Sequence, residues 1–284
     1  MKHQELISPL DNRYNNKIID LANNFSESNL NKTRFEIEID WIIFLTTYGG
    51  KNFKTLSSAA KKNLLLIKNG FNEKSAKRIK SIESKTNHDV KAVEYFIREE
   101  MDRFTNLKQY QHLVHFALTS EDINSLSYAV LLRDAKNIYL KKLNILIKDL
   151  NSKSRTWASI PFLARTHGQA ASPSTIGKEI KVFHQRLLRQ KDSLSKMVPL
   201  AKFGGATGNF HTLELSDASI DWLSKTQKFL SSFKIEQNPI TTQIEPHDGI
   251  AEISHCIQRI NNILIDLNQD IWTYIANDIF KLKQ

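Results

Sequence analysis

Three stretches of the chain repeat apolar residues every three or four positions, as amphipathic helices do. They cover residues 120–156, 174–198 and 248–284, and each is much longer than the roughly 11 residues of an average helix. A helix of about 30 residues is ~45 Å long, which suits an elongated bundle better than a compact globule. No strand pattern competes with these helices. The sequence therefore predicts an all-α fold whose main part is a bundle of long helices.

The chain before residue 110 has shorter helical patterns. They are interrupted by YGGKN at residues 48–52 and by KNGFN at residues 68–72, where glycine and asparagine favour turns. We therefore predict a small helical domain over residues 1–110, followed by a long-helix bundle domain over residues 111–284.

Polar residues lie where the long helices are expected to begin. Thr119 or Ser120 can cap the first one, and Glu121 and Asp122 place negative charge in its first turn. Residues 173–175 form a similar start for the second helix. These starts support the predicted helix boundaries.

The stretch KTNHDVKAVEYFIREEM, residues 85–101, places His88 at the head of another amphipathic helix. Two interpretations of His88 remain open. Asn87 or Asp89 caps the helix and His88 is an exposed neighbour, or His88 binds an anion. The second interpretation has a physical basis, because unpaired N–H groups and the positive end of the helix dipole attract anions.

A second histidine lies in LARTHGQAASPS, residues 163–174, where His167 stands between Thr166 and Gly168 in a predicted non-helical turn. Imidazole can donate or accept a proton near neutral pH, an effect worth about 10²- to 10⁴-fold in rate. The alternative is an inert loop histidine. The turn is therefore a candidate site for proton transfer.

Two further polar loops separate the long helices. FGGATGNF, residues 203–210, has the glycines that a close approach of ligand or backbone requires, but it lacks the Lys-Ser or Lys-Thr of a nucleotide P-loop. NPITTQIEPHDGIAE, residues 238–252, offers Gln243 and His247 as candidate contacts. A purely structural role at the start of the third long helix explains His247 equally well.

Composition narrows the possible partners. The 284 residues carry a formal net charge of +10, which raises nucleic acid as a partner. The densest basic run, residues 73–85, is interrupted by Glu73 and Glu83 and lacks stacking aromatic residues. We therefore predict that the protein does not bind nucleic acid.

The chain also lacks the patterns of membrane and metal proteins. No apolar run approaches 18 residues and the first residues do not resemble a signal peptide, so we expect a cytoplasmic protein without a membrane partner. Cys256, the single cysteine, is predicted to pack in a helix. Because the histidines show no helical i, i+4 pair, we predict no metal.

Five segments together resemble the adenylosuccinate lyase family, in the bacterial purine-biosynthetic branch of the fumarase/aspartase superfamily. In chain order they are SPLDNRY, TNHDVKAVEYF, HFALTSEDINSLS, RTHGQAASPSTIGKE and TTQIEPHD. The similarity spans essentially all 284 residues. TSEDIN and TTQIEPHD distinguish this branch from argininosuccinate lyases, fumarases and aspartases.

The resemblance implies a homotetramer in which each active site draws on three chains. The implied reaction eliminates fumarate from adenylosuccinate to give AMP, with a parallel step on the succinylated aminoimidazole carboxamide ribotide. No cofactor is implied. Family members continue beyond this point with a mobile Gly-Ser-Ser-x-Met-Pro loop whose serine is the general base, and the sequence here ends at IANDIFKLKQ. We therefore expect a fragment with an incomplete bundle that is inactive alone.

The resemblance also implies residue roles. His167 is expected to protonate the leaving nitrogen, and His88 is the second predicted catalytic residue. The other predicted substrate contacts are Arg13 and Tyr14 for phosphate and ribose, Asn87 and Asp89 beside His88, Thr119 and Ser120 for the succinyl carboxylate, Thr166 beside His167, and Gln243. The alternatives are another fumarate-releasing lyase of the superfamily and a non-catalytic helical assembly module.

Overall fold

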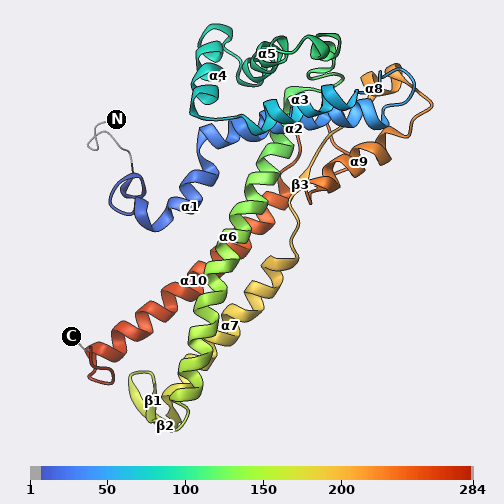
Figure 1. The fold of residues 1–284 in the computed structure, drawn as a ribbon. Helices are drawn as coiled ribbons and strands as arrows, with labels where there is room; N and C mark the ends of the chain where they lie inside the picture. Colours follow the sequence, from blue (N-terminus) through green and yellow to red (C-terminus); the bar gives the residue numbers. More distant parts are fainter. Residues whose placement is uncertain (1–7, 283–284) are drawn as a thin grey trace. The chain divides into compact units, whose positions relative to one another are not determined.

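The computed structural model describes residues 8–282 and consists mainly of helices (Figure 1), so the predicted all-α fold class is confirmed. The helices are η1 (Pro9–Asp11), α1 (Asn15–Phe25), α2 (Glu27–Tyr48), α3 (Ser58–Asn69), α4 (Glu73–Thr86), α5 (Asp89–Asp102), η2 (Thr105–Leu113), α6 (Ser120–Thr156), α7 (Ile176–Lys196), α8 (His211–Ser216), α9 (Trp222–Ser232) and α10 (Asp248–Ala276). The strands are β1 (Pro161–Thr166), β2 (Gln169–Thr175), β3 (Leu200–Ala201) and β4 (Glu236–Gln237).

Contacts group the chain into two compact units. Unit 1 comprises the residues up to Ala135 and the segment Val198–His247, and unit 2 comprises Lys136–Met197 and the residues from Asp248 onward. Helix α6 begins in unit 1 and ends in unit 2. The predicted division into domains at residues 110 and 111 stays a prediction.

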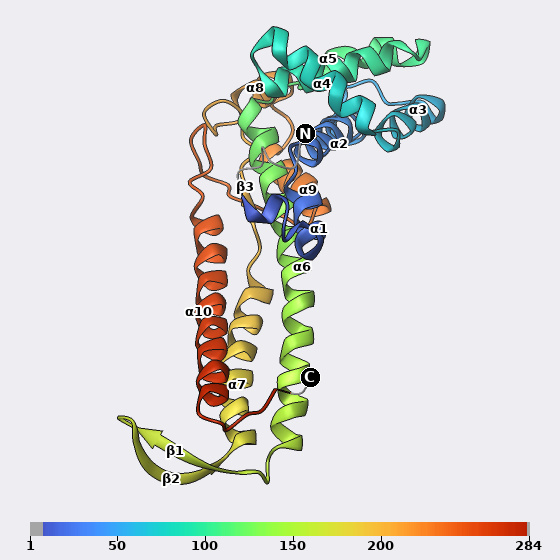
Figure 2. The same cartoon turned by 90° about the vertical axis from the view of Figure 1, so that its left-hand side faces the viewer.

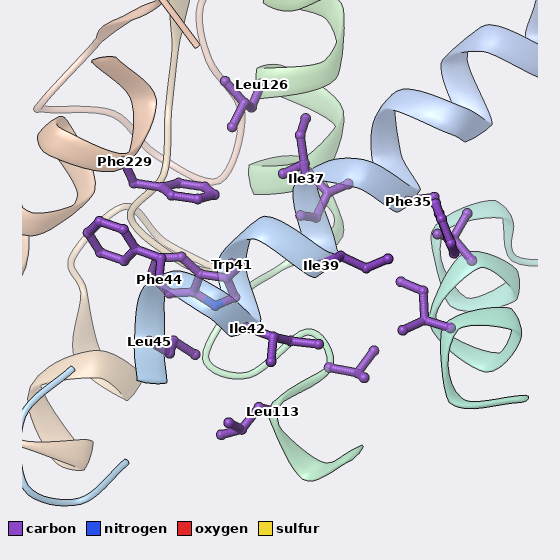
Figure 3. Close-up of a cluster of buried hydrophobic side chains, with 14 of the residues drawn as sticks. Phe35, Ile37, Ile39, Trp41, Ile42, Phe44, Leu45, Leu113, Leu126 and Phe229 are labelled. Carbon is purple, nitrogen blue, oxygen red and sulfur yellow. The ribbon is translucent and has the colours of Figure 1, made fainter. Parts of the chain in front are cut away.

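Helix α2 is the centre of unit 1 because it is apolar on more than one face, so neighbouring helices cover it on several sides. Trp41 of α2 is fully buried beside Phe44 and Phe229 (Figure 3). Its ring centroid lies 5.1 to 5.7 Å from those of Phe44, Phe203 and Phe229. Its indole Nε1 donates a hydrogen bond of 3.0 Å to the Phe116 carbonyl, so the ring buries its apolar surface without leaving its polar atom unpaired.

In unit 2 the later part of α6 runs beside α7 and α10 (Figure 2). Tyr139 of α6 donates to Asn261 of α10 at 3.0 Å. Arg186 of α7 pairs with Asp266 of α10 at 2.7 Å. Cys256 is fully buried in this unit, which confirms its predicted packing role.

The structure also contains four short strands among the described residues, which were not predicted from the sequence. Strands β1 and β2 form an antiparallel hairpin, and β3 pairs with β4 in parallel. The hairpin was missed because most of its side chains are exposed, so it lacks the alternation of apolar and polar residues by which a half-buried strand is recognised.

The third long helix also ends earlier than predicted. Helix α10 stops at Ala276 instead of continuing to residue 284. Asp278 adopts a left-handed conformation with φ 56°, and the Ile279 N–H donates to the Tyr274 carbonyl at 2.9 Å, as in a Schellman C-cap. The Phe280 ring then packs 5.4 Å from the Tyr274 ring, so the chain turns back on the helix. Among the residues described, every helix is too short or too polar to span a bilayer.

Candidate functional site

The start of α5 shows how His88 is held. Asn87 ends α4 in a left-handed conformation with φ 50°, and His88 is itself the N-cap of α5. Its Nδ1 accepts a hydrogen bond of 3.2 Å from the Lys91 N–H. The interpretation that Asn87 or Asp89 caps this helix was therefore wrong. With Nδ1 acting as acceptor, the neutral ring carries its proton on Nε2 and can donate it from a side chain that is 46% exposed.

Asp89, next to His88, is held from α2. Its Oδ2 lies 2.7 Å from Nη2 of Arg34, whose side chain is only 4% exposed and also donates to Asn31. Partial burial raises the pKa of Asp89, but Arg34, the Val90 N–H and His88 together lower it further, so the pKa lies below its ordinary value of 3.8. Asp89 is therefore a carboxylate at neutral pH.

An open depression of about 430 Å³ lies at the junction of α4 and α5. Its lining residues are Lys80, Glu83, Ser84, Asn87 and Asp89. Lys80 already pairs with Glu83 and Glu27 at 2.9 and 2.7 Å. Positive and negative side chains therefore both line the depression, and two of its lining residues, Asn87 and Asp89, are predicted substrate contacts.

Sequence reasoning missed a buried cluster around His115. This residue adopts φ 61°, and its Nδ1 lies 2.5 Å from Oε1 of Glu38, which also accepts the His115 backbone N–H through Oε2. Nε2 of His115 lies 3.9 Å from Glu94, and Glu94 pairs with Lys91 at 2.8 Å. The sequence feature that could have indicated this cluster is a glutamate on the apolar face of each helix, Glu38 in α2 and Glu94 in α5. The cluster links the start of α5 to the segment that leads into α6.

The His115 cluster makes the stability of unit 1 depend on pH. Burial lowers the pKa of His115, but Glu38 and Glu94 raise it further, so the pKa lies above its ordinary value of 6.5. A raised pKa gives stability that is fully present below pH 6.5 and is lost as the pH rises through the folded-state value. We expect the free energy of unfolding to fall more steeply as the pH rises above 6.5 in the wild type than in Glu38→Gln, measured by urea unfolding at a series of pH values. Equal falls in both proteins would contradict this origin.

The start of α6 is joined to the glycine-rich loop by a buried ion pair. Asp122 accepts the Thr119 N–H at 2.8 Å and the Gly205 N–H at 3.2 Å, and it lies 2.7 Å from Nζ of Lys202. Ser120 is the first residue of α6, and both Thr119 and Ser120 are partly exposed. The start of α6 and the glycine-rich loop, residues 203–210, therefore meet at Asp122.

The loop that carries Gln243 approaches the same glycine-rich segment. A Cβ placed on Gly208, which has φ 78°, would lie 2.2 Å from the Thr241 carbonyl oxygen, so only glycine fits there. Glu245 is buried and accepts the His247 N–H at 2.6 Å, while the side chain of Gln243 is exposed. Thr119, Ser120 and the loop of Gln243 are thus brought to one glycine-rich segment in unit 1.

Arg13 and Tyr14 lie between η1 and α1, also in unit 1. The Arg13 guanidinium lies 5.4 Å from the centre of the Tyr14 ring, and both side chains are exposed. Ser8 caps η1 by accepting the Leu10 N–H at 3.2 Å. The structure pairs these two residues with each other, and it records no contact between them and the other predicted site residues over residues 8–282.

Thr166 and His167 belong to unit 2, whereas the other predicted site residues belong to unit 1. His167 and Gly168 have φ 54° and 74° and form the two-residue turn of the β1–β2 hairpin. Positive φ at both positions is the geometry of a type I′ turn, which histidine and glycine tolerate. The His167 side chain is exposed and makes no hydrogen bond or ion pair within the described part of the chain.

Between positions 8 and 282, histidine, cysteine, aspartate and glutamate side chains form no group of three or more that can hold a metal ion. In unit 1 the predicted site residues lie at helix starts, beside glycine turns and next to paired charges.

Comparison with known proteins gives a consistent family. Adenylosuccinate lyase from Escherichia coli (strain K12) is 42% identical over 279 residues, covering 98% of this chain and 61% of that protein. Adenylosuccinate lyase from Haemophilus influenzae (strain ATCC 51907 / DSM 11121 / KW20 / Rd) is 43% identical over 277 residues, covering 97% of this chain and 61% of that protein. The chain thus spans about three fifths of the length of these relatives.

The fold is also similar to that of solved lyases. The crystal structure of fumarate lyase from Mesorhizobium sp. BNC1 matches with a TM-score of 0.73 at 18% identity, covering 90% of this chain and 57% of that one. At this identity the match shows the fold alone. A family model described as "Lyase" matches residues 13–284. The chain therefore belongs to the lyase family that this model describes.

Proposed function

We propose that the protein acts as an adenylosuccinate lyase, which eliminates fumarate from adenylosuccinate and from the succinylated aminoimidazole carboxamide ribotide. The observation that carries the proposal is the arrangement around Asp122, which joins the start of α6 to the glycine-rich loop. That loop in turn contacts the segment of Gln243. A helix start beside glycine backbone offers N–H donors to a carboxylate, and the succinyl group carries two carboxylates. The identity of about 42% to adenylosuccinate lyases supports the same substrate.

The elimination needs two proton transfers by protein groups, one before or during and one after cleavage of the C–N bond. A base removes a proton from a carbon of the succinyl group, the C–N bond breaks, and an acid protonates the leaving nitrogen. We assign the acid role to His167, as the family resemblance implies, and its exposed ring at the tip of the hairpin makes no hydrogen bond or ion pair within the described residues. Thr166 lies beside it at the end of β1.

The remaining residues bind the substrate in this proposal. Thr119 and Ser120 hold the succinyl carboxylate, and Gln243 adds a donor and an acceptor nearby. Arg13 and Tyr14 hold phosphate and ribose, since a guanidinium fork matches phosphate oxygens. His88 donates from Nε2, with Asn87 and Asp89 beside it lining the pocket.

The assembly is proposed to be a cytoplasmic homotetramer with shared active sites. In such an assembly, His167 of one chain reaches a pocket that other chains complete with the residues of unit 1. No nucleic-acid or membrane partner and no cofactor is proposed. Light scattering of the purified protein tests the tetramer, with a monomer as the contradicting result.

Fumarate release by the complete gene product tests the reaction. We expect turnover with adenylosuccinate and none with argininosuccinate or malate. Turnover of either of those instead would assign another lyase of the superfamily. The absence of turnover with all three would favour the helical assembly module, and tight duplex binding with a steep salt dependence would favour a nucleic-acid binder.

A further inference from the structure

Asp122 and Lys202 form the only salt bridge in which both side chains are fully buried among residues 8–282. Their carboxylate and ammonium groups are 2.7 Å apart, and both side chains are 0% exposed. Removing two charges from water costs free energy that the attraction between them often only offsets. An apolar pair of similar size would therefore serve packing at least as well, and the ion pair calls for another explanation.

The hydrogen bonds of this pair supply one. Oδ2 of Asp122 accepts the Thr119 N–H at 2.8 Å, and both carboxylate oxygens lie 3.2 Å from the Gly205 N–H. The Lys202 ammonium donates to the Gly205 carbonyl at 2.6 Å, and the Lys202 backbone N–H donates to Ser125 at 3.1 Å. The two charged groups therefore fix both polar atoms of one glycine and the residue directly before α6.

Both oxygens of Asp122 face hydrogen-bond donors, so the side chain at this position must accept hydrogen bonds through both of its polar atoms. A carboxylate accepts through both oxygens, whereas an asparagine amide has one accepting oxygen and one donating nitrogen. An asparagine at position 122 would point its NH₂ group either at the Thr119 N–H or at the Lys202 ammonium and the Gly205 N–H. From the sequence, Asp122 was predicted only to place negative charge at a helix start. In the structure it also links the start of α6 to the glycine-rich loop, since it accepts a hydrogen bond from Gly205, 83 positions further along the chain.

We propose that Asp122 and Lys202 are positioning residues that hold the start of α6 and the glycine-rich loop as one carboxylate-binding subsite. This inference rests on the proposed function, because it assigns the fumarate part of the substrate to that subsite. Neither side chain touches substrate, since both are fully buried. They act through the N–H groups of the segments that they hold in place.

A double-variant experiment separates positioning from stability. Asp122→Asn leaves the Lys202 charge buried without a counter-charge, and Lys202→Met does the same to Asp122, so each single variant loses thermal stability. The double variant Asp122→Asn/Lys202→Met buries no charge, and we expect its melting temperature to return toward the wild-type value. It still lacks the Lys202 donor to the Gly205 carbonyl and places an NH₂ group close to the Thr119 or the Gly205 N–H, so we expect fumarate affinity to remain reduced by at least about 10-fold.

The readouts are the melting temperature and the dissociation constants for fumarate and AMP, measured separately on the complete gene product. Fumarate affinity falls in the double variant while AMP affinity stays within about twofold, because the phosphate and ribose contacts lie elsewhere in the proposed site. Asp40→Asn is the matched control. Asp40 forms a half-buried pair with Lys68 at 2.6 Å in unit 1. We expect the loss of this pair to leave fumarate affinity unchanged.

Two results would overturn the inference. Fumarate affinity that recovers together with the melting temperature shows that the pair is only structural. Equal losses of fumarate and AMP affinity show a general disturbance of the fold. Failure of the proposed function is distinct, because the wild-type protein would then bind neither ligand, and the positioning role would fall with it.

Discussion

Replacing His167 with asparagine is expected to lower the rate of fumarate release from adenylosuccinate by about 10²- to 10⁴-fold, the usual contribution of a proton-transfer group. Asparagine tolerates the left-handed conformation that His167 adopts with φ 54°, so the hairpin turn is retained. Because the change removes the acid and not a binding group, the loss appears in kcat with little change in the dissociation constant for substrate.

The matched control is His112→Asn, which replaces an exposed histidine in η2. We expect its kcat to equal that of the wild type. A His167→Asn protein with wild-type kcat would remove His167 from the reaction. A loss of substrate binding without a loss of kcat would make it a binding residue.

Replacing Trp41 with alanine is expected to lower the free energy of unfolding of unit 1 by about 3–5 kcal/mol. The ring is fully buried among Phe44, Phe203 and Phe229, and these neighbours belong to α2, α9 and the glycine-rich loop. Its loss leaves a cavity and an unpaired carbonyl at Phe116. Urea unfolding followed by circular dichroism measures the change.

Two further variants test the origin of this loss of stability. Trp41→Phe keeps most of the apolar contact but loses the donor to the Phe116 carbonyl. We therefore expect its free energy of unfolding to fall by about 1–3 kcal/mol. Leu66→Ala on α3 is the control, because this side chain is 60% exposed and its removal should change stability by less than about 0.5 kcal/mol. A Trp41→Ala protein as stable as the control would contradict the described core.

The long helices were predictable because their signals are local. The predicted range 120–156 is the observed range of α6, and α7 begins and ends within two residues of the prediction. The position of His88 at the head of α5 was predicted for the same reason, since an apolar stripe and polar starting residues lie within a few turns. Such patterns need no knowledge of the rest of the fold.

The missed features depend on contacts between distant residues. His115 and Glu38 are 77 positions apart, and nothing near either residue indicates that they meet. Asp122 and Lys202 are likewise joined only by the folded chain. The β1–β2 hairpin was missed for another reason, because exposed strands carry no hydrophobic alternation. The roles of the predicted site residues rest on family resemblance and stay predictions.

Subunit mixing tests the central claim, that residues of unit 1 and His167 of another chain complete one site. Two variants of the complete gene product, His88→Asn and His167→Asn, are first assayed separately to verify that each is inactive. They are then unfolded together and refolded together, with mixing verified by native mass spectrometry. We expect the mixture to regain fumarate release, because some sites combine intact residues from different chains. Verified mixed assemblies without activity would contradict it.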